Sequence, residues 1–167
     1  MHRASAFRFV VLALALVLAS CSERPKLARL PGDAVVLAFG DSLTYGSGAA
    51  EHESYPAQLE ALIGRRVVQA GVPGEVTAQA LARLPRLLDE HSPKLVLLCI
   101  GGNDFLRRLG RTQAEENVRA MVKVARKRGI DVLLIGTPEP GLRVTTPEFY
   151  GVIAERVAER LRQSGAI

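Results

Sequence analysis

The chain has 167 residues, of which 48% are hydrophobic and 23% charged, a composition that suits one globular α/β domain and excludes a disordered chain. Its formal net charge is +5, or +3 without residues 1–20, which hold two arginines and no acids. Aromatic residues are only 5% and form no stripe with the basic residues, so we expect no nucleic acid partner.

The first 20 residues have the pattern of a secretory signal peptide. Arg3 and Arg8 precede an apolar run at 9–18 that is too short to span a membrane, and small residues follow it. The segment Leu18-Ala19-Ser20-Cys21 resembles the bacterial lipobox, and this resemblance implies cleavage before Cys21 and a lipid on its thiol. Ser22 after the cysteine then implies the outer membrane. The alternative is a plain signal peptide with an incidental cysteine.

These signals divide the chain into a signal peptide at 1–20, a lipid-anchored tether at 21–32 and one domain at 33–167. Pro31-Gly32 marks the boundary between tether and domain. The protein is therefore expected to be exported to the periplasm and anchored through its N-terminus.

Strands and helices are predicted to alternate along the domain. Apolar runs predict strands at 34–39, 65–70, 94–100 and 130–136, and helical periodicity predicts helices at 55–63, at 77–90, from about 112 to Gly129, and from Pro147 onward.

Several local signals refine the helices. Thr112 to Glu115 is typical of a capping box that opens a helix, and Thr146 is expected to cap the last helix, with Pro147 at its first position. Helical spacing predicts core-facing side chains at Leu59, Leu62 and Ile63, at Ala80, Leu81, Leu84, Leu87 and Leu88, at Ala114, Val118, Met121, Val122 and Ala125, and at Phe149, Ile153, Val157 and Leu161.

Four strands alternating with four helices predict a three-layer α/β/α fold with a parallel sheet. Ligands of such folds bind beyond the carboxyl ends of the strands. Three loops are expected to meet there: the loop with Ser42, the loop at 71–74 and the loop with Asn103.

Two of these loops carry motifs. Gly40-Asp41-Ser42-Leu43 follows the first predicted strand, and Gly101-Gly102-Asn103-Asp104 follows the third. Ser42 alone could be an ordinary cap of a strand-to-helix loop. The pair of motifs in this order resembles the SGNH (GDSL) hydrolase family, and 67–108 is similar to its periplasmic acyl-thioesterase, lysophospholipase and arylesterase branch.

The resemblance implies a flavodoxin-like strand order and a role for each motif. Ser42 would be the nucleophile, and its own N–H, the N–H of Gly74 and the side-chain amide of Asn103 would bind the developing oxyanion. Gly74 could instead be a plain turn residue and Asn103 a loop cap. Gln69 stands where this branch often has Asn, which puts some of the supporting hydrogen bonds in doubt.

The implied function is hydrolysis of carboxylic esters or thioesters, arylesterase-like or lysophospholipase-like. The expected partner is a small acyl ester or thioester, with lysophospholipid among the candidates, and the membrane is contacted through the N-terminal lipid. No cofactor or metal is expected.

One part of the family pattern is absent from the sequence. The family takes its base from a C-terminal Asp-x-x-His block beyond a fifth strand, and none of His2, His52 and His91 lies in such a context. His52 is on the correct side of the sheet, but a loop histidine between two glutamates is typical of the surface. We therefore expect a C-terminally truncated SGNH domain. The alternative functions are a catalytically impaired fragment and a noncatalytic acyl-binding or lipid-binding lipoprotein.

Three smaller predictions follow from the same sequence. Cys99 is expected to be a buried free thiol, although a Cys21 to Cys99 disulfide is the alternative. The cluster of Arg107, Arg108 and Arg111 could lie near an anionic substrate group or form a solvated face. The segment 130–135 is expected to be an uncovered, aggregation-prone sheet edge.

Overall fold

The structure is a computed structural model and describes residues 26–137 and 146–167. Its centre is a parallel sheet of β1 (Val36–Gly40), β2 (Val67–Gly71), β3 (Leu95–Cys99) and β4 (Asp131–Leu134) in the order β2-β1-β3-β4. This is the order of a flavodoxin-like sheet, so the predicted α/β class and strand order are confirmed. The signal peptide, Cys21 and the rest of 1–25 lie outside the described residues.

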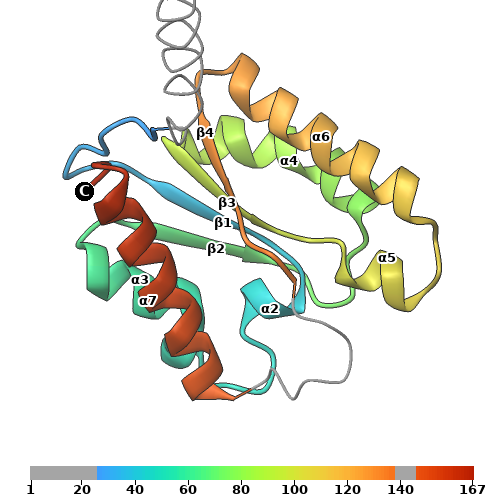
Figure 1. Cartoon of the computed structure of the whole chain (residues 1–167), viewed down its shortest axis with the longest axis horizontal. Helices are drawn as coiled ribbons and strands as arrows, with labels where there is room; N and C mark the ends of the chain where they lie inside the picture. Colours follow the sequence, from blue (N-terminus) through green and yellow to red (C-terminus); the bar gives the residue numbers. More distant parts are fainter. Residues whose placement is uncertain (1–25, 138–145) are drawn as a thin grey trace, which may run out of the picture.

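Helices cover both faces of the sheet and make the three predicted layers (Figure 1). On one face, α3 (Tyr55–Ile63) and α7 (Pro147–Gln163) pack together, and on the other α4 (Thr77–His91) packs with α6 (Arg111–Lys127). Three short elements lie in the loops: α2 (Ser42–Tyr45), the 3₁₀ turn η1 (Glu51–Glu53) and α5 (Gly102–Leu106).

The two inner strands are buried along their whole length, whereas the two outer strands are not. Val36 and Ala38 of β1 face the α3 and α7 layer, and Leu37 and Phe39 face the α4 and α6 layer. Alternate residues of an inner strand thus face opposite helix layers, and both faces are buried. This explains why the inner strands are unbroken apolar runs in the sequence.

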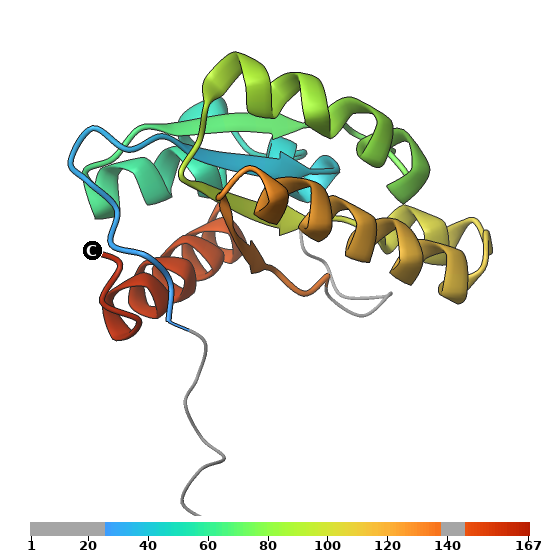
Figure 2. The ribbon, with the colours of Figure 1, turned by 90° about the horizontal axis from the view of Figure 1, so that it is seen from above.

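The outer strand β4 lies at the margin of the sheet, and Figure 2 shows it there. Its residues are half-buried or exposed, and Leu134 is 58% exposed. Among the described strands it is therefore the exposed edge that the sequence predicts.

Two sequence predictions were wrong in detail. Leu62 is exposed, because the buried face of α3 is formed by Tyr55, Pro56, Leu59 and Ile63. The capping box at Thr112 does not form: α6 begins at Arg111 after Gly110, whose φ of 97° turns the chain sharply, and Glu115 pairs with Arg111 instead.

The start of α7 agrees with the prediction. The Thr146 side chain accepts a hydrogen bond from the Phe149 N–H at 3.4 Å, and Pro147 is the first helical residue. Within the described part of the chain, no helix has the length and apolar character needed to cross a bilayer.

Candidate active site

Ser42 lies directly beyond the carboxyl end of β1, as the first residue of the single-turn helix α2. Asp41 caps this turn, because its carboxylate accepts a hydrogen bond from the Leu43 N–H at 3.0 Å. Gly46 ends the turn in the left-handed region, with φ of 88°. Ser42 is part-buried and lies on this short, capped turn at the edge of the sheet.

Two glycines allow the turn of Ser42 to lie close to the neighbouring strands. A Cβ at Gly40 would overlap the Cys99 carbonyl and the Thr44 hydroxyl. A Cβ at Gly71 would overlap the backbone of Asp41, Thr44 and Tyr45. Glycine is therefore required at both strand ends by close approach.

The second loop follows β2 and carries Gly74. Its backbone has φ of 77°, a left-handed conformation that favours glycine, and its carbonyl accepts a hydrogen bond from Arg107 at 2.8 Å. The next residue, Glu75, is buried and forms an ion pair with Arg83 at 2.6 Å. Arg83 also lies over the Phe39 ring, 4.4 Å from its centroid, and so ties this loop to β1.

The third loop follows β3 and carries Asn103 in α5. The Asn103 Nδ2 donates a hydrogen bond to the Glu75 carbonyl at 3.0 Å, which joins the third loop to the second. The first loop joins both: the Asp41 N–H donates to the Cys99 carbonyl at 3.3 Å, and the Val72 N–H donates to the Gly40 carbonyl at 3.0 Å. The three loops thus meet at one edge of the sheet, as predicted.

A buried polar network holds the third loop in place. Asp104 accepts hydrogen bonds from the Thr77 N–H at 2.9 Å and the Thr77 hydroxyl at 2.6 Å. The Thr77 hydroxyl in turn accepts one from Asn117 Nδ2 at 3.0 Å. These three buried residues connect α5, α4 and α6, so the position of Asn103 depends on all three helices.

Several hydrogen-bond donors at this edge are unused. The backbone N–H groups of Ser42 and Gly74 bond to no other described residue. Asn103 Nδ2 carries two hydrogens, and the Glu75 carbonyl takes one of them. Free donors on a rigid edge are what a site needs to bind a developing negative charge.

Burial also shifts two pKa values at this edge. Desolvation raises the pKa of Asp41, with the nearby carboxylates of Glu75 and Asp104 adding to the effect and the Leu43 N–H opposing it. Desolvation raises the pKa of the Cys99 thiol to about 12, and the Asp41 charge contributes. Cys99 is a buried free thiol, as predicted, and is not a nucleophile at neutral pH.

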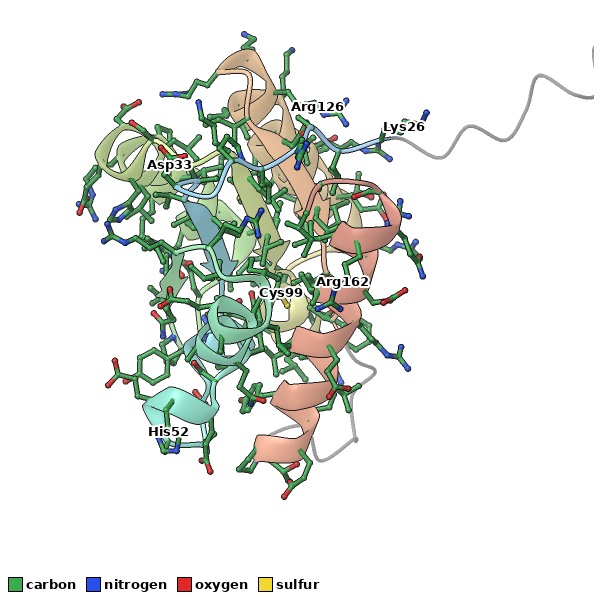
Figure 3. All side chains as sticks on the ribbon, turned by 90° about the vertical axis from the view of Figure 1, so that its left-hand side faces the viewer. Lys26, Asp33, His52, Cys99, Arg126 and Arg162 are labelled. Carbon is green, nitrogen blue, oxygen red and sulfur yellow. The ribbon has the colours of Figure 1, made fainter. Side chains whose placement is uncertain are left out.

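The histidines do not complete the site. His52 is exposed in η1 and its side chain lies at the outer margin of the molecule (Figure 3). His91 is the last residue of α4, and its Nε2 lies 3.6 Å from Glu90 Oε1. Because β3 begins four residues later, His91 lies at the amino-terminal edge of the sheet. In 26–137 and 146–167 no hydrogen bond joins Ser42 to a histidine.

No local pattern in the sequence points to the residues that support the site. Asp104 is part of the Gly-Gly-Asn-Asp motif, but its bonds to Thr77 come from a residue 27 positions away. Glu75 and Arg83 likewise give no local signal, because their ion pair joins the loop after β2 to a residue of α4 that lies 8 positions away. The described residues include no group of three His, Cys, Asp or Glu side chains that could hold a metal ion.

Curated relatives match most of the domain. The chain is 35% identical over 131 residues to the esterase TesA of Pseudomonas aeruginosa, which covers 75% of this chain and 65% of that protein. It is 32% identical over 121 residues to an arylesterase of Vibrio mimicus, covering 70% and 57%. It is 33% identical over 118 residues to thioesterase 1/protease 1/lysophospholipase L1 of Escherichia coli, covering 70% and 53%. The matches thus span about half to two thirds of these relatives.

Solved structures agree with the sequence relatives. The SGNH-hydrolase family esterase AlinE4 superposes with a TM-score of 0.62 at 34% identity, covering 76% of this chain and 73% of that one. The crystal structure of TesA gives a TM-score of 0.61 at 32% identity, covering 78% and 74%. The model of the GDSL-like Lipase/Acylhydrolase family matches residues 38–166. The chain therefore belongs to the GDSL-like lipase/acylhydrolase family.

Proposed function

We propose that this chain carries the nucleophile and the oxyanion donors of a serine esterase or acyl-thioesterase. The observation that carries the proposal is the meeting of three loops that present Ser42, Gly74 and Asn103 with unused donors. The relatives are named as an esterase, an arylesterase and a thioesterase/lysophospholipase, which supports ester and thioester bonds as the substrate class.

In the proposed reaction, the Ser42 hydroxyl oxygen attacks the carbonyl carbon of the ester or thioester. The negative charge that develops on the carbonyl oxygen is bound by the N–H groups of Ser42 and Gly74 and by the free hydrogen of Asn103. The acyl group stays on Ser42 while the alcohol or thiol leaves with a proton, and water then releases the acid.

This chemistry needs a base for Ser42. We propose that the base belongs to a C-terminal Asp-x-x-His block that follows a fifth strand beside β4. The exposed edge of β4 and the exposure of His52 support this over a base from 26–137. The Asp-x-x-His histidine would take the Ser42 proton and pass it to the leaving group.

A cavity next to the nucleophile suits the acyl part of the substrate. It has a volume of about 540 Å³ and is lined by Leu43, Leu133, Ile135, Phe149 and Ile153, with Arg156 and Arg160 also present. Leu43 follows Ser42 directly, so an acyl chain on Ser42 would have apolar side chains within reach. We therefore propose that the acyl group of the substrate is apolar and of a size that this cavity can hold.

We propose further that the protein is exported to the periplasm. The signal-like residues 1–20 support export, and the lipobox-like segment at Cys21 supports a lipid anchor in the outer membrane. Intact mass of the expressed protein tests the anchor, because an unacylated N-terminus at any residue other than Cys21 contradicts it.

The test of the main proposal compares the 167-residue chain with a version continued by an Asp-x-x-His block. Fluorophosphonate should label the continued version once, on Ser42, and Ser42→Ala should abolish labelling and p-nitrophenyl acetate hydrolysis with the fold intact. The 167-residue chain should be a poor hydrolase, with residual catalysis of about 10³–10⁴ over water. Labelling of another residue contradicts the role of Ser42. Equal activity of the two versions contradicts the proposal that the base lies in the Asp-x-x-His block.

A second candidate function is noncatalytic acyl binding. The observation that favours it is the apolar cavity beside Leu43 together with the two arginines that could bind a carboxylate. A fatty acid that binds the 167-residue chain, with affinity unchanged in Ser42→Ala, would support this candidate.

A further inference from the structure

We propose that Arg107 is a positioning residue of the reaction: it holds the turn at 72–75 in place, so that the Gly74 N–H stays directed at the developing oxyanion. The inference rests on the proposed function, because it gives Arg107 a task in the same reaction. Two hydrogen bonds of Arg107 and the geometry of the turn support it.

The loop after β2 forms a tight turn whose two central residues are Pro73 and Gly74. The Glu75 N–H donates a hydrogen bond to the Val72 carbonyl at 3.1 Å and closes the turn, and Gly74 has φ of 77°. Proline followed by a glycine with positive φ is typical of a type II turn. A type I turn differs by reversal of the peptide between the two central residues, and that peptide carries the Gly74 N–H. The turn type therefore sets the direction in which the proposed donor points.

Both ends of this turn are tied to other parts of the fold. The Val72 N–H donates a hydrogen bond to the last carbonyl of β1 at 3.0 Å, and the Glu75 carbonyl accepts one from Asn103 Nδ2 at 3.0 Å. Between these ends, the carbonyl of Gly74 accepts one hydrogen bond from the described residues, and its donor is Arg107 Nη2 at 2.8 Å. The centre of the turn therefore depends on Arg107.

Arg107 also binds the residue that carries another of the proposed donors. Its backbone N–H donates to the Asn103 carbonyl at 3.0 Å, while its side chain bonds to Gly74 in the neighbouring loop. Figure 1 shows α5, which ends at Leu106, beside the loop that joins β2 to α4. One residue thus links the two loops that present Gly74 and Asn103, and it occupies neither of the proposed donor groups.

The guanidinium of Arg107 lies directly against Gly74. A Cβ added at Gly74 would be 3.2 Å from Arg107 Nη2. The Arg107 side chain is exposed, but a charged donor forms a stronger hydrogen bond with a carbonyl than a neutral donor does. The glycine at 74 and the arginine at 107 therefore fit closely together.

The other two arginines of this cluster have different surroundings. Arg111 pairs with Glu115 at 2.7 Å. Among the described residues, the Arg108 side chain has no partner in a hydrogen bond or an ion pair. The three arginines therefore do not act as one basic face. Kinetics separates a positioning role of Arg107 from binding of an anionic substrate group, because positioning acts on kcat and binding of the ground state acts on KM.

The test compares variants of the version continued by an Asp-x-x-His block, with p-nitrophenyl acetate as the substrate. Arg107→Met keeps an unbranched apolar stem without a donor. It should lower kcat about tenfold and change KM by less than about twofold, because one oxyanion donor loses its fixed position. Arg107→Lys keeps a charged donor and should recover part of the loss. The matched control Arg108→Met removes the same charge one residue further along and should behave like the parent.

Three results of these kinetics overturn the proposal. The first is a kcat of Arg107→Met equal to that of the parent. The second is an equal loss in Arg108→Met, which would make the effect one of charge alone. The third is a change confined to KM, which would assign Arg107 to substrate binding instead.

A second readout depends neither on the base nor on catalysis. In the 167-residue chain, amide relaxation measured by NMR should show a rigid Gly74 N–H in the parent and in Arg108→Met, and a Gly74 N–H that moves on the ps–ns timescale in Arg107→Met. The Val72 N–H, which is bonded to β1, should stay rigid in all three. A Gly74 N–H that stays rigid in Arg107→Met overturns the proposal. Absence of Ser42 labelling in the continued parent would contradict the proposed function alone, because the relaxation data still report whether Arg107 holds Gly74.

Discussion

The inner strands β1 and β3 with their loops are held by different contacts from the outer strand β4 and helix α6. Around β1 and β3, every strand residue is buried, and the loops are joined by short hydrogen bonds between backbone groups and buried side chains. In contrast, β4 is half-exposed and the side chains of α6 that face outward are charged. The edge that carries Ser42 is therefore fixed by buried contacts, whereas β4 and the outer face of α6 are not.

The largest effect should come from Asn103. In a version continued by an Asp-x-x-His block, Asn103→Ala should lower kcat by roughly 10²–10³ with a smaller change in KM, because the lost donor acts on the transition state. Phe105→Ala, at an exposed position two residues further along α5, should leave hydrolysis of soluble p-nitrophenyl acetate unchanged. An unchanged kcat in Asn103→Ala would remove this residue from the oxyanion site.

The same Leu→Ala substitution should lower the free energy of unfolding by very different amounts on the inner and outer strands. Leu97 of β3 is fully buried, so Leu97→Ala should lower the free energy of unfolding by about 2–5 kcal/mol. Leu134 of β4 is 58% exposed, so Leu134→Ala should cost less than about 1 kcal/mol. Urea denaturation measures both, and similar costs would mean that β4 is covered in solution.

The buried network of Asp104 should contribute strongly to stability. Asp104→Ala leaves the Thr77 N–H and hydroxyl without their acceptor and should lower the free energy of unfolding by about 3 kcal/mol. Glu116→Ala, an exposed acidic residue on α6, is the matched control and should change it by less than about 0.5 kcal/mol. A small effect of Asp104→Ala in thermal or urea unfolding would show that Thr77 finds another partner.

The backbone around Thr44 lies so close to Gly71 that adding a single methyl group there should destabilise the fold. Because its Cβ would overlap the backbone around Thr44, Gly71→Ala should lower the free energy of unfolding by about 1–3 kcal/mol. It should also displace Ser42, so fluorophosphonate labelling of the continued version should slow. Gly136→Ala is the control, since a Cβ there has nothing within 4 Å.

The smallest effect concerns the pH dependence of stability at Asp41. Burial raises the pKa of this carboxyl above its ordinary value of 3.8, so the folded protein holds the proton more tightly than the unfolded chain. The stability that this pKa difference contributes is complete below pH 3.8, and it is lost as the pH rises through the pKa that Asp41 has in the folded state. Asp41→Asn should remove that loss and become more stable than the parent toward neutral pH. Thermal unfolding from acid to neutral pH, with exposed Asp33→Asn as control, should reveal a difference that grows with pH; a constant difference would contradict it.

Much of the architecture could be predicted because its signals are local. An inner parallel strand must be apolar at every position, so β1 and β3 are visible as unbroken runs in the sequence. The caps of helices depend on neighbouring residues, which is why Thr146 was predicted correctly. The capping box at Thr112 fails for a related reason: Gly110 is the N-cap and the helix already begins at Arg111, which the pattern at Thr112 does not reveal.

The candidate site was predictable only in part. Two motifs, each after a strand, placed Ser42 and Asn103 at the same edge, because parallel strands end together. The roles of these residues and of Gly74 remain proposals, and so do the base and the lipid on Cys21. The contacts that fix the site, from Asp104 to Thr77 and from Asn103 to Glu75, join residues 27 and 28 positions apart.

The sequence by itself therefore determined the class of fold, the order of strands and helices, and the position of the two motifs at strand ends, since these follow from hydrophobic periodicity and short-range turns. Only the tertiary structure decided which donors at the edge are left unused and which glycines are required by close approach. Those features depend on which segments meet in space, and side chains that meet across 27 residues leave no periodic pattern along the chain.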